Sequence, residues 1–183
     1  MTDPIERIKK ALSGREVHRP PLNGNRPAAV LVPLYFDGSE WRMVFTKRTH
    51  KVESHKGQIS FPGGSRDPED SSFAETALRE TEEEIGVRRE DIGIIGRLDP
   101  IVTVTSYLVH PFVGLIPYPY EFKLNKFEVD RLIELPLERL IDEAGEQVGN
   151  VVSGLDLNFN RRGDLIWGVT ARILYQLIQE TFL

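Results

Sequence analysis

The sequence predicts an α/β protein in which a mixed β-sheet lies between helices. Two observations support this fold class: strand-like segments alternate with three or four amphipathic helical segments, and the first two strands are joined by a turn. The chain has 183 residues, of which 40% are hydrophobic and 28% charged, as in ordinary globular domains. This length allows one domain with a substantial core.

A helix is predicted over residues 3–12, at the start of the chain. Asp3 can cap its first turn, and Pro4 suits the position that follows. Apolar side chains then recur at helical spacing, at Ile5, Ile8 and Leu12. The segment is therefore expected to be an amphipathic helix.

Prolines and glycines interrupt regular structure in residues 18–27. We therefore expect an N-terminal helix and linker over residues 1–25, followed by one main domain over residues 26–183. The sequence shows no low-complexity tract and no repeat of solenoid length.

The main domain is expected to begin with a hairpin. Residues 28–36 and 41–48 read as strands joined around Asp37 and Gly38. Residues 57–64 then read as a short strand that runs into a pair of glycines.

A helix over residues 72–85 follows the glycine pair. Ser72 and Glu75 form a capping-box pattern at its start, and Gly86 supplies a left-handed stop. One stripe of this helix is expected to pack on the sheet, and it consists of Ala74, Ala77, Leu78, Thr81 and Ile85. The remaining elements are strands over 92–100 and 106–117, a strand that turns into a short helix over 128–142, a strand pair over 150–158 and 164–168, and a final helix over 169–182.

The composition excludes several classes of protein. The sequence has no cysteine, so any metal must be bound by oxygen or histidine ligands. The net charge of −5 argues against general nucleic-acid binding. No apolar run approaches the roughly 20 residues needed to span a bilayer, and the N-terminus lacks the apolar core of a secretory signal. A cytoplasmic location is therefore expected, with no membrane partner.

Four glutamates crowd the end of the predicted helix 72–85. Glu80, Glu83 and Glu84 share one face, whereas Glu82 points the other way. Each carboxylate near a helix C-terminus costs roughly 0.3–1 kcal/mol. Two interpretations remain open at this point: a solvated helix end, or a face that binds a divalent cation such as Mg²⁺ or Mn²⁺. Arg79 is spaced to brace Glu83 from the preceding turn.

A basic stretch stands out against the acidic background. Residues 47–56 carry four cationic side chains and one carboxylate, a local charge of +3. The stretch is either a solvated loop or a surface that holds an anionic substrate.

Residues 63–87, "GGSRDPEDSSFAETALRETEEEIGV", resemble the Nudix box. The R-E-U-x-E-E-x-G-U half of that box is matched in register by Arg79, Glu80, Glu83, Glu84, Gly86 and Val87, with Thr81 at the aliphatic position. The box's outlying glutamate falls on Ser71, so the loop is one residue longer than usual. Either Asp70 substitutes for that glutamate or the role is absent.

Residues 45–64, "FTKRTHKVESHKGQISFPGG", resemble the additional motif of the coenzyme A pyrophosphatase branch of the Nudix hydrolases. The matching residues are Thr46, Arg48, Gly57, Phe61, Pro62, Gly63 and Gly64. Glu53 stands where that motif usually has arginine. With downstream segments, the resemblance covers most of residues 26–183 and implies a Nudix-type α/β/α sandwich.

The resemblance implies a metal-dependent hydrolase of a small nucleotide substrate. Mg²⁺ or Mn²⁺ would be bound by Glu80, Glu83, Glu84 and the Gly64 carbonyl, with Arg79 as a further catalytic residue. Substrate contacts are expected from Arg48, Lys51, Lys56 and Gly63. The general base is Glu80 or, alternatively, Glu128.

The implied reaction is hydrolysis of coenzyme A to 3′,5′-ADP and 4′-phosphopantetheine. An ADP-ribose or other nucleoside-diphosphate pyrophosphatase is the alternative within the same enzyme class, and a non-catalytic Nudix-like nucleotide sensor is the alternative outside it. A homodimer is expected by resemblance alone.

Overall fold

The computed structural model describes residues 3–18, 20–50, 57–147, 158–161 and 164–183. Its elements are α1 (Pro4–Leu12), β1 (Arg26–Phe36), β2 (Trp41–Arg48), β3 (Ile59–Ser60), β4 (Gly63–Ser65), α2 (Phe73–Ile85), η1 (Arg89–Asp91), β5 (Gly93–Arg97), β6 (Ile101–Val102), β7 (Tyr107–Leu115), β8 (Val129–Pro136), α3 (Leu137–Gln147), β9 (Asn158–Arg161), β10 (Asp164–Trp167) and α4 (Gly168–Thr181).

The main sheet is mixed and is centred on β1. Its strand order is β3-β2-β1-β7-β5, with β8 paired to β2, β4 paired to β1 and β6 paired to β7. The pairing of β1 with β7 is parallel, whereas the other pairings are antiparallel. β9 and β10 form a separate two-stranded sheet.

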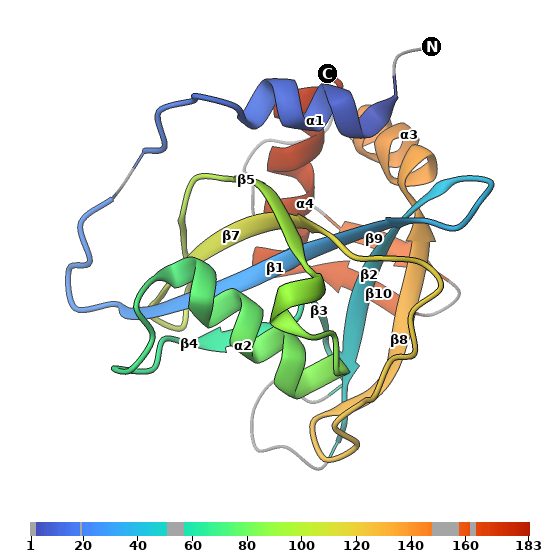
Figure 1. Ribbon diagram of the computed structural model, residues 1–183. Helices are drawn as coiled ribbons and strands as arrows, with labels where there is room; N and C mark the ends of the chain where they lie inside the picture. The colour runs from blue at the N-terminus through green and yellow to red at the C-terminus, as the bar shows by residue number, and fades with distance from the viewer. Residues whose placement is uncertain (1–2, 19, 51–56, 148–157, 162–163) are drawn as a thin grey trace.

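The sheet separates two hydrophobic clusters. One cluster packs α2 on the sheet and includes Ala77, Ile85 and Leu31 of β1. The other lies on the opposite face and packs α1, α3 and α4, with Leu34 of β1 against Leu174 and its neighbours. β1 serves both clusters because successive side chains of a strand point to opposite faces. Figure 1 shows α2 in front of the sheet and α4 behind it, which confirms the expected α/β/α sandwich.

The N-terminal helix is part of the second cluster. Ile5, Ile8 and Leu12 are buried there, and Trp41 of β2 donates an indole hydrogen bond to the Asp3 carboxylate at 3.0 Å. The N-terminal helix therefore packs on the main domain, and the division of the chain after residue 25 stays a prediction.

Most of the predicted elements are confirmed, with small differences in extent. The single strand expected over residues 57–64 is divided into β3 and β4. The expected strand over 92–100 is shorter in the structure, where β5 ends at Arg97, and the short strand β6 begins just beyond the predicted range. The first member of the C-terminal strand pair begins at Asn158, and residues 150–157 of that prediction lie outside the described residues. Among the described residues, no helix has the length and apolar character needed to cross a membrane.

Candidate functional site

The helix that carries the glutamates begins at a capped end. The Ser72 side chain accepts a hydrogen bond from the Glu75 backbone N–H at 3.1 Å, as the sequence predicted. The Glu75 carboxylate does not close the box on Ser72 but accepts hydrogen bonds from the backbone N–H and hydroxyl of Ser71. At the other end Gly86 has φ 73°, a left-handed conformation that ends the helix.

The packed stripe of α2 is partly different from the predicted one. Ala77, Thr81 and Ile85 are buried as expected. Ala74 and Leu78 are only half-buried, whereas Thr76 and Glu84 are buried. The buried face of α2 therefore differs from the predicted face. It is turned toward the loop before the helix and toward β2, where polar partners are available for Thr76 and Glu84.

Arg79 is anchored by Asp70 rather than by a residue at position 71. Its guanidinium donates to both carboxylate oxygens of Asp70 at 3.0 Å and to the Ser65 carbonyl at 3.1 Å. These bonds hold the pKa of the buried Asp70 carboxyl well below its usual range and raise the pKa of Arg79. Asp70 therefore makes the contact with Arg79 that the sequence, with its longer loop, had left undecided.

Arg79 also contacts two glutamates of its own helix. Its Nη1 donates to Glu80 Oε1 at 2.8 Å and lies 3.3 Å from Glu83 Oε2. The predicted brace on Glu83 exists, but the contact with Glu80 is shorter. The Glu83 side chain is 55% exposed, so it lies at the rim of the glutamate face.

Glu80 packs directly against the glycine pair. A Cβ placed on Gly64 would lie 2.5 Å from Glu80 Oε2, so only glycine allows this approach. Gly63 has φ 155°, and a Cβ there would lie 2.4 Å from the Ala29 carbonyl oxygen. Burial raises the pKa of Glu80, while the hydrogen bond from Arg79 opposes the change.

Glu84 is the most buried member of the face. Its side chain is 5% exposed, and its Oε2 has no hydrogen-bond partner in the described part of the chain. Burial raises the pKa of the Glu84 carboxyl to about 8; Arg48 opposes this shift, and the charges of Glu80 and Glu128 add to it. The backbone N–H of Gly63 hydrogen-bonds to the carboxyl and also lowers its pKa.

Arg48 reaches the site from the end of β2. Its guanidinium lies 3.7 Å from Glu84 and 3.9 Å from Glu128, both longer than a hydrogen-bonded ion pair. Its buried Nε has no hydrogen-bond partner among the described residues. The structure therefore places this predicted substrate contact between two carboxylates.

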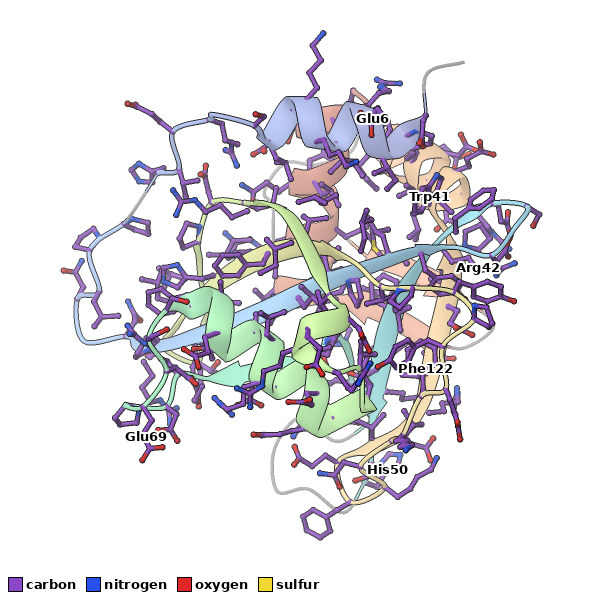
Figure 2. The ribbon with its side chains drawn as sticks, in the orientation of Figure 1. Glu6, Trp41, Arg42, His50, Glu69 and Phe122 are labelled. Carbon is purple, nitrogen blue, oxygen red and sulfur yellow. The ribbon has the colours of Figure 1, made fainter. Side chains whose placement is uncertain are left out.

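Glu128 is held at the site by the loop before β8. The Asn125 side chain donates to Glu128 Oε1 at 3.2 Å, and the Asn125 backbone N–H donates to the Glu84 carbonyl at 2.9 Å. The Lys123 backbone N–H likewise donates to the Ile85 carbonyl at 3.0 Å. Figure 2 shows Phe122, from the same segment, beside the C-terminal end of α2, while Glu69 lies at the loop before it.

The sequence offered no signal for Asn125, because the residue joins the site from a loop far along the chain. Other predicted residues are more readily placed. Glu82 points away from the face and pairs with Arg89 at 2.8 Å, as expected. Lys51 and Lys56 lie outside the described residues.

The donor set fits a divalent cation. Within the described ranges, no three carboxylates or imidazoles already converge on one point as a metal cluster. However, Glu84 offers a buried oxygen without a hydrogen-bond partner, Glu80 lies near enough for its charge to act on Glu84, and both are hard oxygen donors. Glu83, exposed at the rim, is the third carboxylate of the predicted set.

Two cavities lie elsewhere. One of about 790 Å³ is lined by α1, α3 and α4, and one of about 350 Å³ is lined by Tyr35, Tyr118, Glu134 and their neighbours. Neither includes a residue of the glutamate face. The candidate site is identified from its side-chain chemistry.

Comparisons with known proteins bear on the same part of the chain. The model of the NUDIX domain matches residues 25–149. A Nudix hydrolase NudL of Photorhabdus laumondii is 35% identical over 170 residues, which cover 86% of this chain and 86% of the relative. The NudL of Yersinia pestis is 34% identical over 168 residues, covering 85% of this chain and 80% of the relative.

Solved structures share the fold at lower identity. An Ap4A hydrolase of C. elegans, in a binary complex, has a TM-score of 0.53 and 20% identity, covering 63% of this chain and 83% of that one. The NUDIX domain of Shewanella oneidensis NrtR, complexed with ADP ribose, has a TM-score of 0.52 and 17% identity, covering 64% and 77%.

Proposed function

The chain belongs to the Nudix family, and on that premise we propose that it hydrolyses the diphosphate linkage of coenzyme A or a coenzyme A derivative. The products would be 3′,5′-ADP and 4′-phosphopantetheine. One observation carries the proposal: the buried Glu84, with its unpaired Oε2, lies beside Glu80 and the glycine pair on a helix that Arg79 and Asp70 hold in place.

The site residues have distinct roles in this proposal. Glu80, Glu83, Glu84 and the Gly64 carbonyl would hold Mg²⁺ or Mn²⁺. When bound, that ion would offset the charge of the diphosphate and lower the pKa of the attacking water. Arg79 orients Glu80 and Glu83 through the contacts described above.

The hydrolytic step itself requires a proton acceptor. Water adds to one phosphorus, the bridging P–O bond breaks, and the water's proton passes to a carboxylate. Glu80 is one acceptor, because it lies against Gly64 on the glutamate face. Glu128 is the other, because it faces the same site from the loop before β8.

Substrate preference rests on the 45–64 motif. Its residues Arg48 and Gly63 border the glutamate face, and Lys51 and Lys56 belong to the same motif. A coenzyme A substrate carries a 3′-phosphate in addition to its diphosphate, and a group of cationic side chains suits that extra charge.

A second candidate is hydrolysis of ADP-ribose or another nucleoside-diphosphate compound. Glu53, in place of the motif's usual arginine, favours it. A nucleotide sensor without hydrolytic activity is the candidate of a different class. The complete set of Arg79, Glu80, Glu83 and Glu84 argues against that sensor, because a protein that only binds has no need of clustered carboxylates.

Product analysis tests these candidates directly. The protein is incubated with coenzyme A, ADP-ribose, NADH or a diadenosine polyphosphate, with either metal, and the products are identified by mass. We expect coenzyme A to be cleaved fastest and Glu83→Gln to lose at least about a hundredfold in rate. Equal turnover of all four compounds would remove the coenzyme A assignment, and no turnover of any would favour the sensor.

A further inference from the structure

Charge is unevenly compensated within the site. In the described part of the chain, five carboxylates lie within 3.9 Å of one of two guanidiniums. Arg79 serves Asp70, Glu80 and Glu83, and Arg48 is the described cation that lies beside Glu84 and Glu128. The five carboxylates are Asp70, Glu80, Glu83, Glu84 and Glu128.

Arg48 is held by charge and not by directional bonds. Its nearest carboxylate oxygens lie at 3.7 Å and 3.9 Å, whereas hydrogen-bonded pairs of this type are about 2.7–2.9 Å long. Both Arg48 Nε and Glu84 Oε2 are buried without a hydrogen-bond partner in the described ranges. A guanidinium placed in this way balances charge while leaving Glu84 Oε2 uncommitted.

We propose that Arg48 is the internal counter-ion of this site: it neutralises Glu84 and Glu128 when no divalent cation is bound, and binding of the cation releases it. This inference rests on the proposed function and adds an order of events to it. The metal binds first, and only then is the Arg48 guanidinium available to the anionic substrate.

The proposal predicts antagonism between Arg48 and the metal. A divalent cation at Glu84 meets a like charge only a few ångströms away, so removing that charge strengthens metal binding. By linkage, the metal also weakens the contribution of Arg48 to stability. Replacing Arg48 therefore lowers the stability of the metal-free protein more than that of the metal-bound protein.

Arg42 provides a matched control on the same strand. Its guanidinium pairs with two carboxylates, Asp37 at 2.5 Å and Glu40 at 2.6 Å. Figure 2 shows it at the end of β2 that lies away from His50 and the Arg48 end. Arg42→Gln removes a guanidinium that also lies beside two carboxylates, in closer contact than at Arg48, without touching the glutamate face.

The experiment measures Mn²⁺ binding by electron paramagnetic resonance of the free ion, with no substrate present. We expect Arg48→Gln to bind Mn²⁺ at least about tenfold more tightly than the wild type, equivalent to about 1.4 kcal/mol. Arg48→Lys, which keeps the charge, and Arg42→Gln are expected to match the wild type. Thermal unfolding with and without Mn²⁺ should show the difference between wild type and Arg48→Gln closing when the ion is bound.

A second measurement follows the wild-type protein directly, and the charge-keeping variant Arg48→Lys serves only to assign its resonance. The Nε–H resonance of Arg48, identified by its loss in Arg48→Lys, is followed by NMR during titration with diamagnetic Mg²⁺. Release of the guanidinium predicts a clear shift, while the Nε–H resonance of Arg42 stays in place.

Three results would overturn the inference. Equal or weaker Mn²⁺ binding by Arg48→Gln would mean that Arg48 does not oppose metal binding or that it helps to position the metal ligands. An unchanged Arg48 resonance would mean that it is not released. In both cases, continued hydrolysis of coenzyme A would leave the proposed function intact. If the wild type bound neither ion and hydrolysed nothing, both proposals would fail together.

Discussion

The two arginines of the site hold their carboxylates in different ways. Arg79 donates to Asp70 at 3.0 Å and to Glu80 at 2.8 Å, and every one of its partners lies in residues 65–83. Arg48 stands 3.7 Å and 3.9 Å from Glu84 and Glu128, which come from α2 and from the loop before β8. We refer to these as the Arg79 half and the Arg48 half of the site.

The difference separates two tasks. The Arg79 half is local in sequence and fully hydrogen-bonded, so it fixes the position of the helix and of Glu80 before any ligand arrives. The Arg48 half is assembled from distant segments and leaves buried polar atoms without partners. Such atoms are costly unless something else satisfies them, so in the proposed function a ligand's charge is accepted at this half of the site.

The largest expected effect concerns stability. In the metal-free protein, Arg79→Gln should lower the free energy of unfolding by about 3 kcal/mol, because it leaves the buried Asp70 carboxylate without its partner. Arg48→Gln should cost about 1 kcal/mol, because its contacts are long and Glu84 can take up a proton. Urea unfolding at neutral pH measures both. Equal losses would mean that the two halves do not differ as described.

The pH dependence of stability should also divide between the halves. The folded pKa of Glu84, about 8, exceeds that of an unfolded glutamate, about 4.3, so the folded state binds more protons in this range. The metal-free protein should therefore lose stability as the pH rises from about 4.3 to about 8. The pKa of Asp70 is lowered instead, so its contribution should be lost as the pH falls below that of an unfolded aspartate.

Urea unfolding at several pH values distinguishes the loss of stability toward pH 8 from the loss of stability in acid. Glu84→Gln should remove the loss of stability toward pH 8 and leave the loss of stability in acid unchanged. Asp70→Asn should do the reverse. A wild type whose stability stays level between pH 6 and pH 8 would contradict the assigned burial of the Glu84 charge.

Sequence reasoning succeeded where the relevant contacts are local. The capping of α2 by Ser72, the stop at Gly86 and the outward direction of Glu82 all follow from spacing within one helix. It was incomplete at Asp70, because the longer loop left open whether Asp70 substitutes for the outlying glutamate or the role is absent, and the contact with Arg79 is visible only in the structure.

Long-range contacts set the limit of that reasoning. Asn125 and Glu128 reach α2 from a loop about 40 residues later in the chain, and no periodicity links positions so far apart. The position of Arg48 between two carboxylates was likewise hidden, because the motif identifies the residue but not its neighbours. The burial of Glu84 required the same knowledge of how β2 packs beside the helix.

A smaller effect on stability, but a clear one on activity, is expected at Gly64. In Gly64→Ala the new methyl group would meet the Glu80 carboxylate at 2.5 Å, and the flexible end of that side chain can move away. The fold should therefore be nearly unaffected, while displacement of Glu80 should lower kcat about tenfold or more. Gly93→Ala, with open space around its Cβ, is the control. An unchanged kcat in Gly64→Ala would mean that the position of Glu80 does not affect the reaction.

The smallest effect is expected at Glu82, the glutamate that neither half of the site uses. It pairs with Arg89 at 2.8 Å, and both side chains are more than a third exposed, so their interaction contributes only about 0–1 kcal/mol. Glu82→Gln should leave kcat and Mn²⁺ binding unchanged, although it removes one charge from the same crowded stretch as Glu83→Gln. If the two variants lost activity equally, the general negative potential of the helix end would matter and the inward-facing carboxylates would have no special role. Unequal losses tie the function to the face that Arg79 and Arg48 enclose.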